Sequence, residues 1–332
     1  MESLQNILFS GAGFTKNFGG LLAKEMWSKI FNHSEVQSQI RLKDLILNDF
    51  DYESIYHKIM NGDFTAKEKK SINTVIYNAY KVLDDICCQW TFRKDVQYPV
   101  NIYGINRLIE RFSGSKNKFG FFFTLNQDLF IERHFNSPSH NTAIIHPGVP
   151  KIPNPNKPIF TLSIGNEDFI NVPTLNELKS NKVNPLSRNV IHYVKLHGSF
   201  GWKSSKGADS YVIGKEKEKQ VIDEPLLSWY FKLFKNVLSE PNKKLLLIGY
   251  GFRDRHINEV IANSVENNGL KIYIISPSEQ SSFMKNLKSE EYGETILKGL
   301  SGYYPYKLLE IFPFDQSNSH AWKEILDSYF NR

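Results

Sequence analysis

The sequence predicts an α/β fold, in which a Rossmann-like, doubly wound and mainly parallel sheet carries an inserted helical lobe. Three observations lead to this prediction. Apolar runs typical of strands buried on both faces occur at the start of the chain and again after residue 118. Helical periodicity separates several of these runs, as in a parallel sheet covered by helices. Between the first two runs, residues 36–111 show successive amphipathic helical patterns with almost no strand signal.

The expected strands are short and strongly apolar, and they lie at residues 6–10, 119–123, 143–145, 193–196, 244–249 and 272–275. A helix is expected at residues 254–263, and a closing helix at residues 319–330. These elements place a Rossmann-like domain in residues 1–35 and 112–332, around a helical insertion at residues 36–111.

A long loop is predicted at residues 147–185, which are rich in Pro and Asn, with one short strand at residues 159–163. Loops of this length in compact domains are often functional lids. The net charge is +6, and basic residues alternate with acidic ones. The two lysine clusters, at residues 67–70 and 215–219, both contain Glu and predict solvated surface. We therefore expect no direct contact with nucleic acid.

The two cysteines, Cys87 and Cys88, are adjacent within a helical pattern, where neighbouring side chains do not face each other. A structural disulfide is not expected, and two cysteines cannot supply a four-thiolate zinc site. The first residues lack the pattern of a signal peptide, and no apolar run has a membrane-spanning length. The expected location is the cytoplasm.

The first candidate motif is a glycine turn after the first strand, formed by Gly11, Ala12 and Gly13 and followed by Thr15. Glycines at such a turn let the backbone approach a pyrophosphate, beside the partial positive charge of a helix N-terminus. Lys16 occupies the place of the third glycine of the dinucleotide fingerprint, so a simple tight turn is the alternative.

The second motif places Thr124, Asn126 and Asp128 after a hydrophobic strand. In an open parallel sheet, ligands bind at the carboxyl ends of the strands, which predicts that these polar groups face a crevice. The alternative is a helix start, with Asn126 or Asp128 as its cap.

Two histidines follow expected strands and are candidate proton acceptors. His197 precedes Gly198, which permits an abrupt turn, and His146 precedes Pro147. A free imidazole titrates near neutral pH, which makes either residue a plausible proton acceptor, although a lone histidine is more often structural than catalytic.

Two more strands end in polar or glycine residues. Gly249 and Tyr250 follow one strand, where the alternative is an ordinary strand-to-helix connection capped by Asp254. Ser276 follows the strand after it. Together with the earlier motifs, these strand ends predict a crevice large enough for a dinucleotide.

The order of the segments GAGFT, TLNQD, KLHGS and GYGF resembles the NAD-binding core of the sirtuins, and above all the sirtuin-like domains of bacterial anti-phage defence systems. The resemblance covers residues 6–30 and 119–277. Thr15 stands where the sirtuin pattern has Ser, and Tyr250 with Gly251 departs from the Gly-Thr-Ser of deacetylases. The four-cysteine zinc module of deacetylases is also missing.

The resemblance implies NAD+ as substrate, no metal, and roles for individual residues. Asn126 is expected to hold the nicotinamide ribose and a water, and His197 to act as a general base. The expected cofactor-binding residues are Gly11, Ala12, Gly13, Thr15, Thr124, Asp128, Gly249, Tyr250 and Ser276. The first turn would contact the phosphates, and the last three residues the pyrophosphate and adenosine side.

The resemblance further implies an NAD+ hydrolase that depletes the cofactor on phage infection. Such an enzyme needs control by a second defence protein, such as an ATP-driven DNA translocase or another sensor, or by a homo-oligomeric state. Two alternatives remain open. One is a non-catalytic module that senses NAD+ or ADP-ribose, and the other is a sirtuin-type deacylase or ADP-ribosyltransferase.

Overall fold

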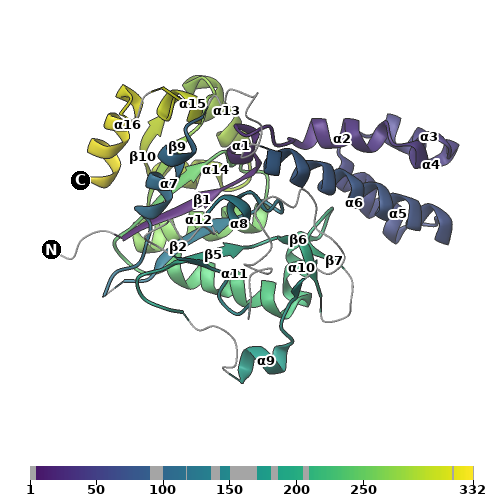
Figure 1. The fold of residues 1–332 in the computed structure, drawn as a ribbon, viewed down its shortest axis with the longest axis horizontal. Coiled ribbons are helices and arrows are strands. Elements are labelled where there is room, and N and C mark those ends of the chain that lie inside the picture. The colour runs from purple at the N-terminus through teal and green to yellow at the C-terminus, as the bar shows by residue number, and fades with distance from the viewer. Residues whose placement is uncertain are drawn as a thin grey trace.

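The computed structural model describes residues 5–89, 100–116, 118–135, 143–149, 170–180, 186–204, 209–315 and 318–331. Its centre is a seven-stranded sheet with the order β10-β9-β8-β1-β2-β5-β3, and every pairing is parallel (Figure 1). The strands are β1 (Gln5–Ser10), β2 (Gly120–Thr124), β3 (Ile144–Ile145), β5 (Ile191–Lys195), β8 (Lys243–Ile248), β9 (Lys271–Ile275) and β10 (Leu300–Tyr304). The predicted α/β fold is confirmed. The strand at β10 was not predicted from the sequence.

The central strands are buried on both faces, which explains their continuous apolar sequences. Alternate residues of β1 belong to different cores, since Leu8 packs into one cluster while Ile7 and Phe9 pack into the other. Successive side chains of any strand point to opposite faces of the sheet, so the other central strands divide between the two cores in the same way. Helices on both faces are therefore required, as in a doubly wound fold.

One face of the sheet packs against α1 (Ala12–Lys16), α7 (Ile102–Glu110), α8 (Phe130–His134), α15 (Leu308–Ile311) and α16 (His320–Ile325), which continues as a π-helix, η2 (Leu326–Phe330). The other face packs against α11 (Pro225–Leu238), α12 (Arg255–Asn268), α13 (Gln280–Ser289) and α14 (Gly293–Lys298). The predicted helices after β8 and at the end of the chain are confirmed.

Strand β1 marks the point where the strand order reverses. The chain continues from β1 to β2 and β5 on one side, and β8, β9 and β10 lie on the other. Ligands of open α/β sheets bind outside the carboxyl ends of the strands at such a switch point. The ends of β1, β2 and β8 are therefore the place to look for a site.

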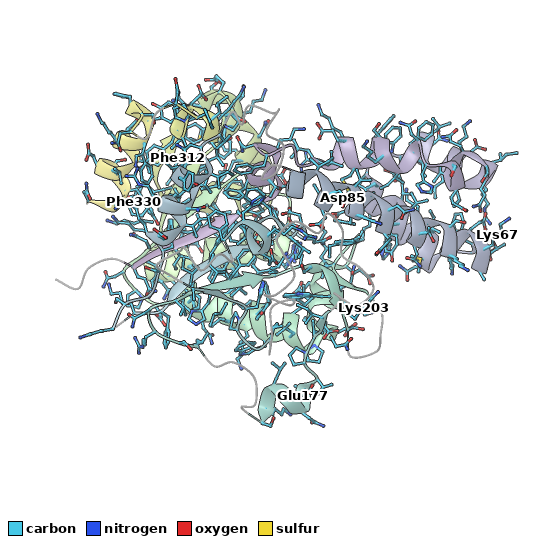
Figure 2. The ribbon with its side chains drawn as sticks, in the orientation of Figure 1. Lys67, Asp85, Glu177, Lys203, Phe312 and Phe330 are labelled. Carbon is cyan, nitrogen blue, oxygen red and sulfur yellow. The ribbon has the colours of Figure 1, made fainter. Side chains whose placement is uncertain are left out.

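A helical lobe projects from one side of the sheet (Figure 1). It consists of α2 (Ala23–Phe31), α3 (Ser34–Gln37), α4 (Ile40–Leu47), α5 (Tyr52–Asn61) and α6 (Ala66–Gln89). Figure 2 shows Lys67 at the outer tip of this lobe and Asp85 nearer the sheet, so α6 runs along its length.

The limits of the lobe differ from the predicted insertion at residues 36–111. Helix α2 packs against α5 and α6 and lies within the lobe. Helix α7 packs on the sheet domain, where a Cβ on Gly104 would lie 2.5 Å from the ring of Phe312. Helical periodicity shows which face of a helix is apolar but not which element covers that face, so it does not fix the limits of a lobe.

A small second sheet has the order β4-β6-β7. Its strands are β4 (Ile170–Asn171), β6 (Gly198–Lys203) and β7 (Asp209–Tyr211), with α9 (Leu175–Lys179) and α10 (Lys217–Asp223) nearby in sequence. The predicted loop at residues 147–185 thus contains a strand and a helix, the latter begun by a capping box of Thr174 and Glu177. The predicted strand at residues 159–163 lies outside the described residues. Among the helices described, none has the length and apolar character needed to cross a membrane.

Candidate functional site

The glycine turns after β1 and β8 pack directly against each other. The amide of Gly13 donates a hydrogen bond to the carbonyl of Gly249 at 3.0 Å. A Cβ on Gly13 would lie 2.7 Å from the Cα of Gly249, and one on Gly249 would lie 2.2 Å from the nitrogen of Phe14. Gly249 also has a φ of +64°, in the left-handed region that favours glycine. Contact between the two turns therefore explains these glycines even before a ligand is considered. Gly11 lies in the same contact, since its Cβ would be 2.8 Å from the carbonyl oxygen of Gly249.

Threonine side chains join the carboxyl ends of β1 and β2 and orient Asn126. The hydroxyl of Thr124 lies 2.8 Å from that of Ser10 and accepts a 3.0 Å hydrogen bond from the amide of Asn126. The side-chain amide of Asn126 donates to the hydroxyl of Thr15 at 3.4 Å. Asn126 is buried, and it is held beside the turn that contains Ala12 and Gly13. The first two motifs are thus brought together.

Asp128 lies two residues further on, in a more polar buried network. Its carboxylate accepts a 3.1 Å hydrogen bond from the amide of Phe130, which begins α8. The ammonium of Lys195 bonds to the carbonyl of Asp128 at 2.5 Å and to the carboxylate of Glu132 at 2.9 Å. Burial raises the pKa of Asp128 to about 6, although Lys195 and the amide of Phe130 oppose the shift. Asp128 therefore contacts the start of α8, although the N-cap residue of that helix is Leu129.

The raised pKa predicts that Asp128→Asn stabilises the protein at high pH. The folded state holds the Asp128 proton more tightly than the unfolded chain, so this residue costs stability progressively as pH rises from about 4 to about 6. An increase from 3.8 to about 6 corresponds to about 3 kcal/mol at pH 8, and to roughly half of that at pH 5. Urea denaturation of both proteins at the two pH values measures this difference. An equal effect at pH 5 and pH 8 would contradict it.

His197 follows β5 and is almost fully buried, with 3% of its surface exposed. Gly198, with a φ of +73°, turns the chain directly into β6. The carbonyl of His197 accepts a 2.8 Å hydrogen bond from the amide of Val212. Burial lowers the pKa of His197 to about 3, so the imidazole is neutral at physiological pH. A neutral ring has one nitrogen lone pair available to accept a proton or a hydrogen bond.

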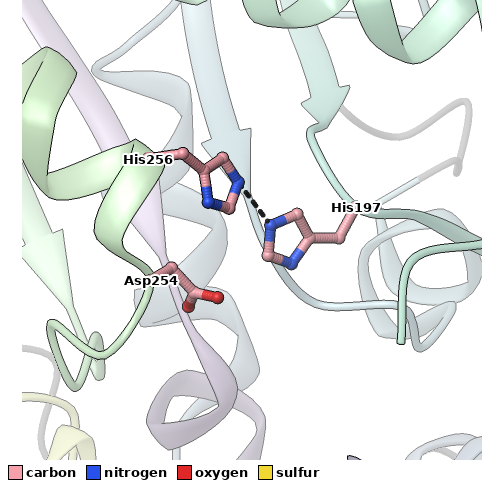
Figure 3. Close-up of side chains that lie close together, drawn as sticks. All are labelled: His197, Asp254 and His256. Carbon is pink, nitrogen blue, oxygen red and sulfur yellow. Dashed lines mark hydrogen bonds between the residues drawn. The ribbon is translucent and has the colours of Figure 1, made fainter. Parts of the chain in front are cut away.

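The nearest side chains to His197 are two residues that the sequence did not single out as catalytic. The Nε2 atoms of His197 and His256 lie 3.1 Å apart, within hydrogen-bonding distance (Figure 3). Asp254 has a carboxylate oxygen close to both rings, since the nearest ligand atoms of the three residues lie within 4.8 Å of one another. Asp254 stands at the N-cap position of α12, as the strand-to-helix alternative predicted, but its side chain makes no capping hydrogen bond. Its position next to a histidine in the first helical turn is a signal that sequence reasoning overlooked.

The histidine pair bridges the carboxyl ends of the central strands. His197 follows β5 and His256 follows β8, and these two strands are separated by β1 and β2. Their ends are three strand spacings apart, roughly 14 Å. The contact between the two imidazoles therefore lies across the carboxyl ends of β1 and β2, on the side where Asn126 lies.

The remaining predicted residues lie apart from this pair. His146 belongs to a separate buried network, with its Nδ1 3.1 Å from the carbonyl of Tyr193 and its Nε2 3.4 Å from Glu132. Tyr250 points its side chain into the core, where its hydroxyl donates to Asn258 at 2.8 Å, so only its backbone borders the glycine turns. Ser276 is half-buried at the end of β9, and its hydroxyl accepts a 3.3 Å bond from a following amide in its own loop.

His197, Asp254 and His256 are the group of described residues whose spacing could hold a metal ion. Two features disfavour a metal there. The hydrogen bond between the imidazoles already uses one nitrogen lone pair. The ammonium of Lys217 lies 2.8 Å from Asp254, and its charge opposes a second cation nearby. The 3.1 Å separation of the two Nε2 atoms lets the two rings share one proton.

The chain matches a known protein-family model. The family model described as a SIR2-like domain matches residues 120–297, which is more than half of the chain. The match begins at β2 and includes Asn126, His197, Asp254 and His256, whereas the glycine turn after β1 precedes it. No curated protein matches the sequence. The chain belongs to the family of SIR2-like domains.

Proposed function

We propose that this protein hydrolyses NAD+ to nicotinamide and ADP-ribose. SIR2-like domains use NAD+ as substrate, and the family is the first support for the proposal. The observation that carries it is the placement of Asn126 and His197. Both side chains are buried at the carboxyl ends of parallel strands, and Asn126 lies beside the first of the paired glycine turns at the switch point.

The reaction breaks the bond between nicotinamide and ribose. The bonding electron pair goes to the nicotinamide nitrogen, and positive charge develops on the ribose until a water molecule adds to it. Asn126, a neutral amide held by the threonines of β2 and α1, orients the ribose and the water without adding charge. His197 is neutral at physiological pH and accepts the proton that the water loses, or holds a ribose hydroxyl.

The biological role that we propose is that of an effector in bacterial anti-phage defence. Its support is the likeness of the four motifs to the sirtuin-like domains of such systems. Uncontrolled loss of NAD+ would kill the host cell, so the activity must be held back until a partner protein or an oligomeric state releases it. The projecting helical lobe offers a surface for that contact (Figure 1).

The direct test incubates the purified full chain with NAD+ and separates the products by chromatography. We expect nicotinamide and ADP-ribose in equal amounts, with and without an acyl-lysine peptide. Parallel reactions contain the product of the neighbouring gene, which supplies an activating partner if one is required. Nicotinamide release only with the peptide would instead favour deacylation. Failure to release nicotinamide under all of these conditions would rule out the hydrolase and favour a binding module.

A further inference from the structure

A chain of partly buried charges connects the helical lobe to the histidine pair. Glu53 lies on α5 of the lobe, and its carboxylate is 2.8 Å from the ammonium of Lys217. The same ammonium is 2.8 Å from the carboxylate of Asp254. The three side chains are between 14% and 26% exposed. Lys217 was predicted to lie on the solvated surface, and that prediction was wrong because two carboxylates from distant elements enclose it.

The backbone makes a second connection between the same parts. The segment at residues 212–217 begins at Val212, whose amide donates to the carbonyl of His197 at 2.8 Å. Next comes Gly214, with a φ of +90°, where a Cβ would lie 3.0 Å from the carbonyl oxygen of Glu53. This segment therefore contacts His197 at one end and passes tightly over α5 before it reaches Lys217.

The charges of this chain bear directly on the two imidazoles. Burial is the main cause that lowers the pKa of both His197 and His256, and Asp254 opposes it while Lys217 reinforces it. Of the other charged groups that face His256, Glu218 raises its pKa and Lys235 lowers it. A carboxylate held at this place stabilises the positive charge that the pair gains on accepting a proton from water.

We infer that Glu53 and Lys217 are positioning residues, which hold Asp254 against the pair of His197 and His256. The helical lobe is thereby part of the catalytic apparatus and not only a surface for partners. The ammonium of Lys217 pairs with the carboxylates of both Glu53 and Asp254. Through Glu53, the lobe therefore determines where Asp254 lies and how fully Lys217 neutralises the negative charge of Asp254. This inference rests on the proposed NAD+ hydrolysis for its kinetic consequences, but its electrostatic consequences hold without it.

The kinetic test is the variant Lys217→Met, which removes the charge and keeps the length of the side chain. We expect kcat to fall roughly tenfold, a part of the 10²–10⁴ contributed by a general base, and KM for NAD+ to change less than about threefold. Lys217→Arg should restore much of kcat, because it keeps the charge between Glu53 and Asp254. If Lys217→Met does not fold, the double variant with Glu53→Gln removes the charges as a pair and is measured instead.

A matched control uses a surface ion pair between the first residue of α12 and the turn that precedes α14. Arg255 and Glu291 are 2.8 Å apart and more than half exposed, and Glu291→Gln should leave kcat within about twofold of the wild type. Equal kcat in Lys217→Met and the wild type would overturn the inference.

A second test uses the ring nitrogen signals of the histidines in nuclear magnetic resonance, without NAD+. Removing the ammonium of Lys217 should raise the pKa of His256, because that charge lowers it in the wild type. This readout also separates the inference from the proposed function. Signals of His197 and His256 that do not change in Lys217→Met would contradict the inference, whether or not the wild type cleaves NAD+.

Discussion

His197→Ala and Asn126→Ala should each release nicotinamide from NAD+ at least about 100-fold more slowly than the wild-type chain. In the first variant, the buried base at the end of β5 is lost, together with its hydrogen bond to His256. In the second, the amide held between Thr124 and Thr15 is lost, and the ribose and water are no longer oriented. Neither side chain belongs to the two hydrophobic cores, so both variants should fold.

The internal control for these variants is His146→Ala. His146 is as buried as His197, but it contacts Glu132 and Tyr193 and not His256. We expect it to keep much of the activity per folded molecule. Nicotinamide is measured by chromatography, and folding by circular dichroism. Wild-type turnover in both His197→Ala and Asn126→Ala would disprove the mechanism, and a loss only in His146→Ala would move the base to that residue.

The sequence predicted the parts of the site that follow from single strands. Thr124, Asn126 and His197 come directly after apolar runs, and parallel strands bring their carboxyl ends to one edge of the sheet. Fold class and these placements need only the order of apolar runs and the direction of pairing. Burial on both faces made β2, β5 and β8 apparent, whereas the half-exposed β10 lacked that signal.

The partners of His197 were not predictable in this way, because they depend on contacts between distant elements. His256 reaches His197 only because the loops after β5 and β8 extend over two intervening strands. Lys217 lies in an alternating run of Lys and Glu, which is typical of solvated surface. Its burial depends on Glu53, a residue of the helical lobe whose packing against the segment at residues 212–217 leaves no trace in local sequence.

The glycines show how one sequence signal can have two physical causes. Glycine turns after β1 and β8 were expected to approach the phosphates of NAD+. In the structure, Gly13 and Gly249 are required by their contact with each other. Loss of activity on substituting either of them would therefore not demonstrate a contact with phosphate, and stability has to be measured first.

Gly249→Ala should destabilise the protein by more than about 4 kcal/mol, or prevent its accumulation in soluble form. The new Cβ would lie 2.2 Å from the nitrogen of Phe14 and 2.3 Å from the carbonyl carbon of Gly13, which are backbone atoms that cannot rotate away. The left-handed conformation at φ +64° adds about 1 kcal/mol for any residue with a Cβ. Thermal unfolding and soluble yield measure the effect. A soluble variant with the unfolding temperature of the wild type would show that the two turns do not touch in solution.

Gly251→Ala is the matched control. It also separates a requirement for contact between the two glycine turns from a requirement for contact with the phosphates of NAD+. Gly251 lies two residues further along the same turn and is exposed, and a Cβ added to it would have no atom within 4 Å beyond its two neighbours in the chain. Its substitution should change stability by less than about 0.5 kcal/mol. If NAD+ passes over this turn, the added methyl group occupies space that the ligand needs, and KM should rise while the unfolding temperature stays constant. If Gly251→Ala is stable and has the KM of the wild type for NAD+, the cofactor phosphates do not contact this turn, since a turn that contacts them closely could not accept the added methyl group.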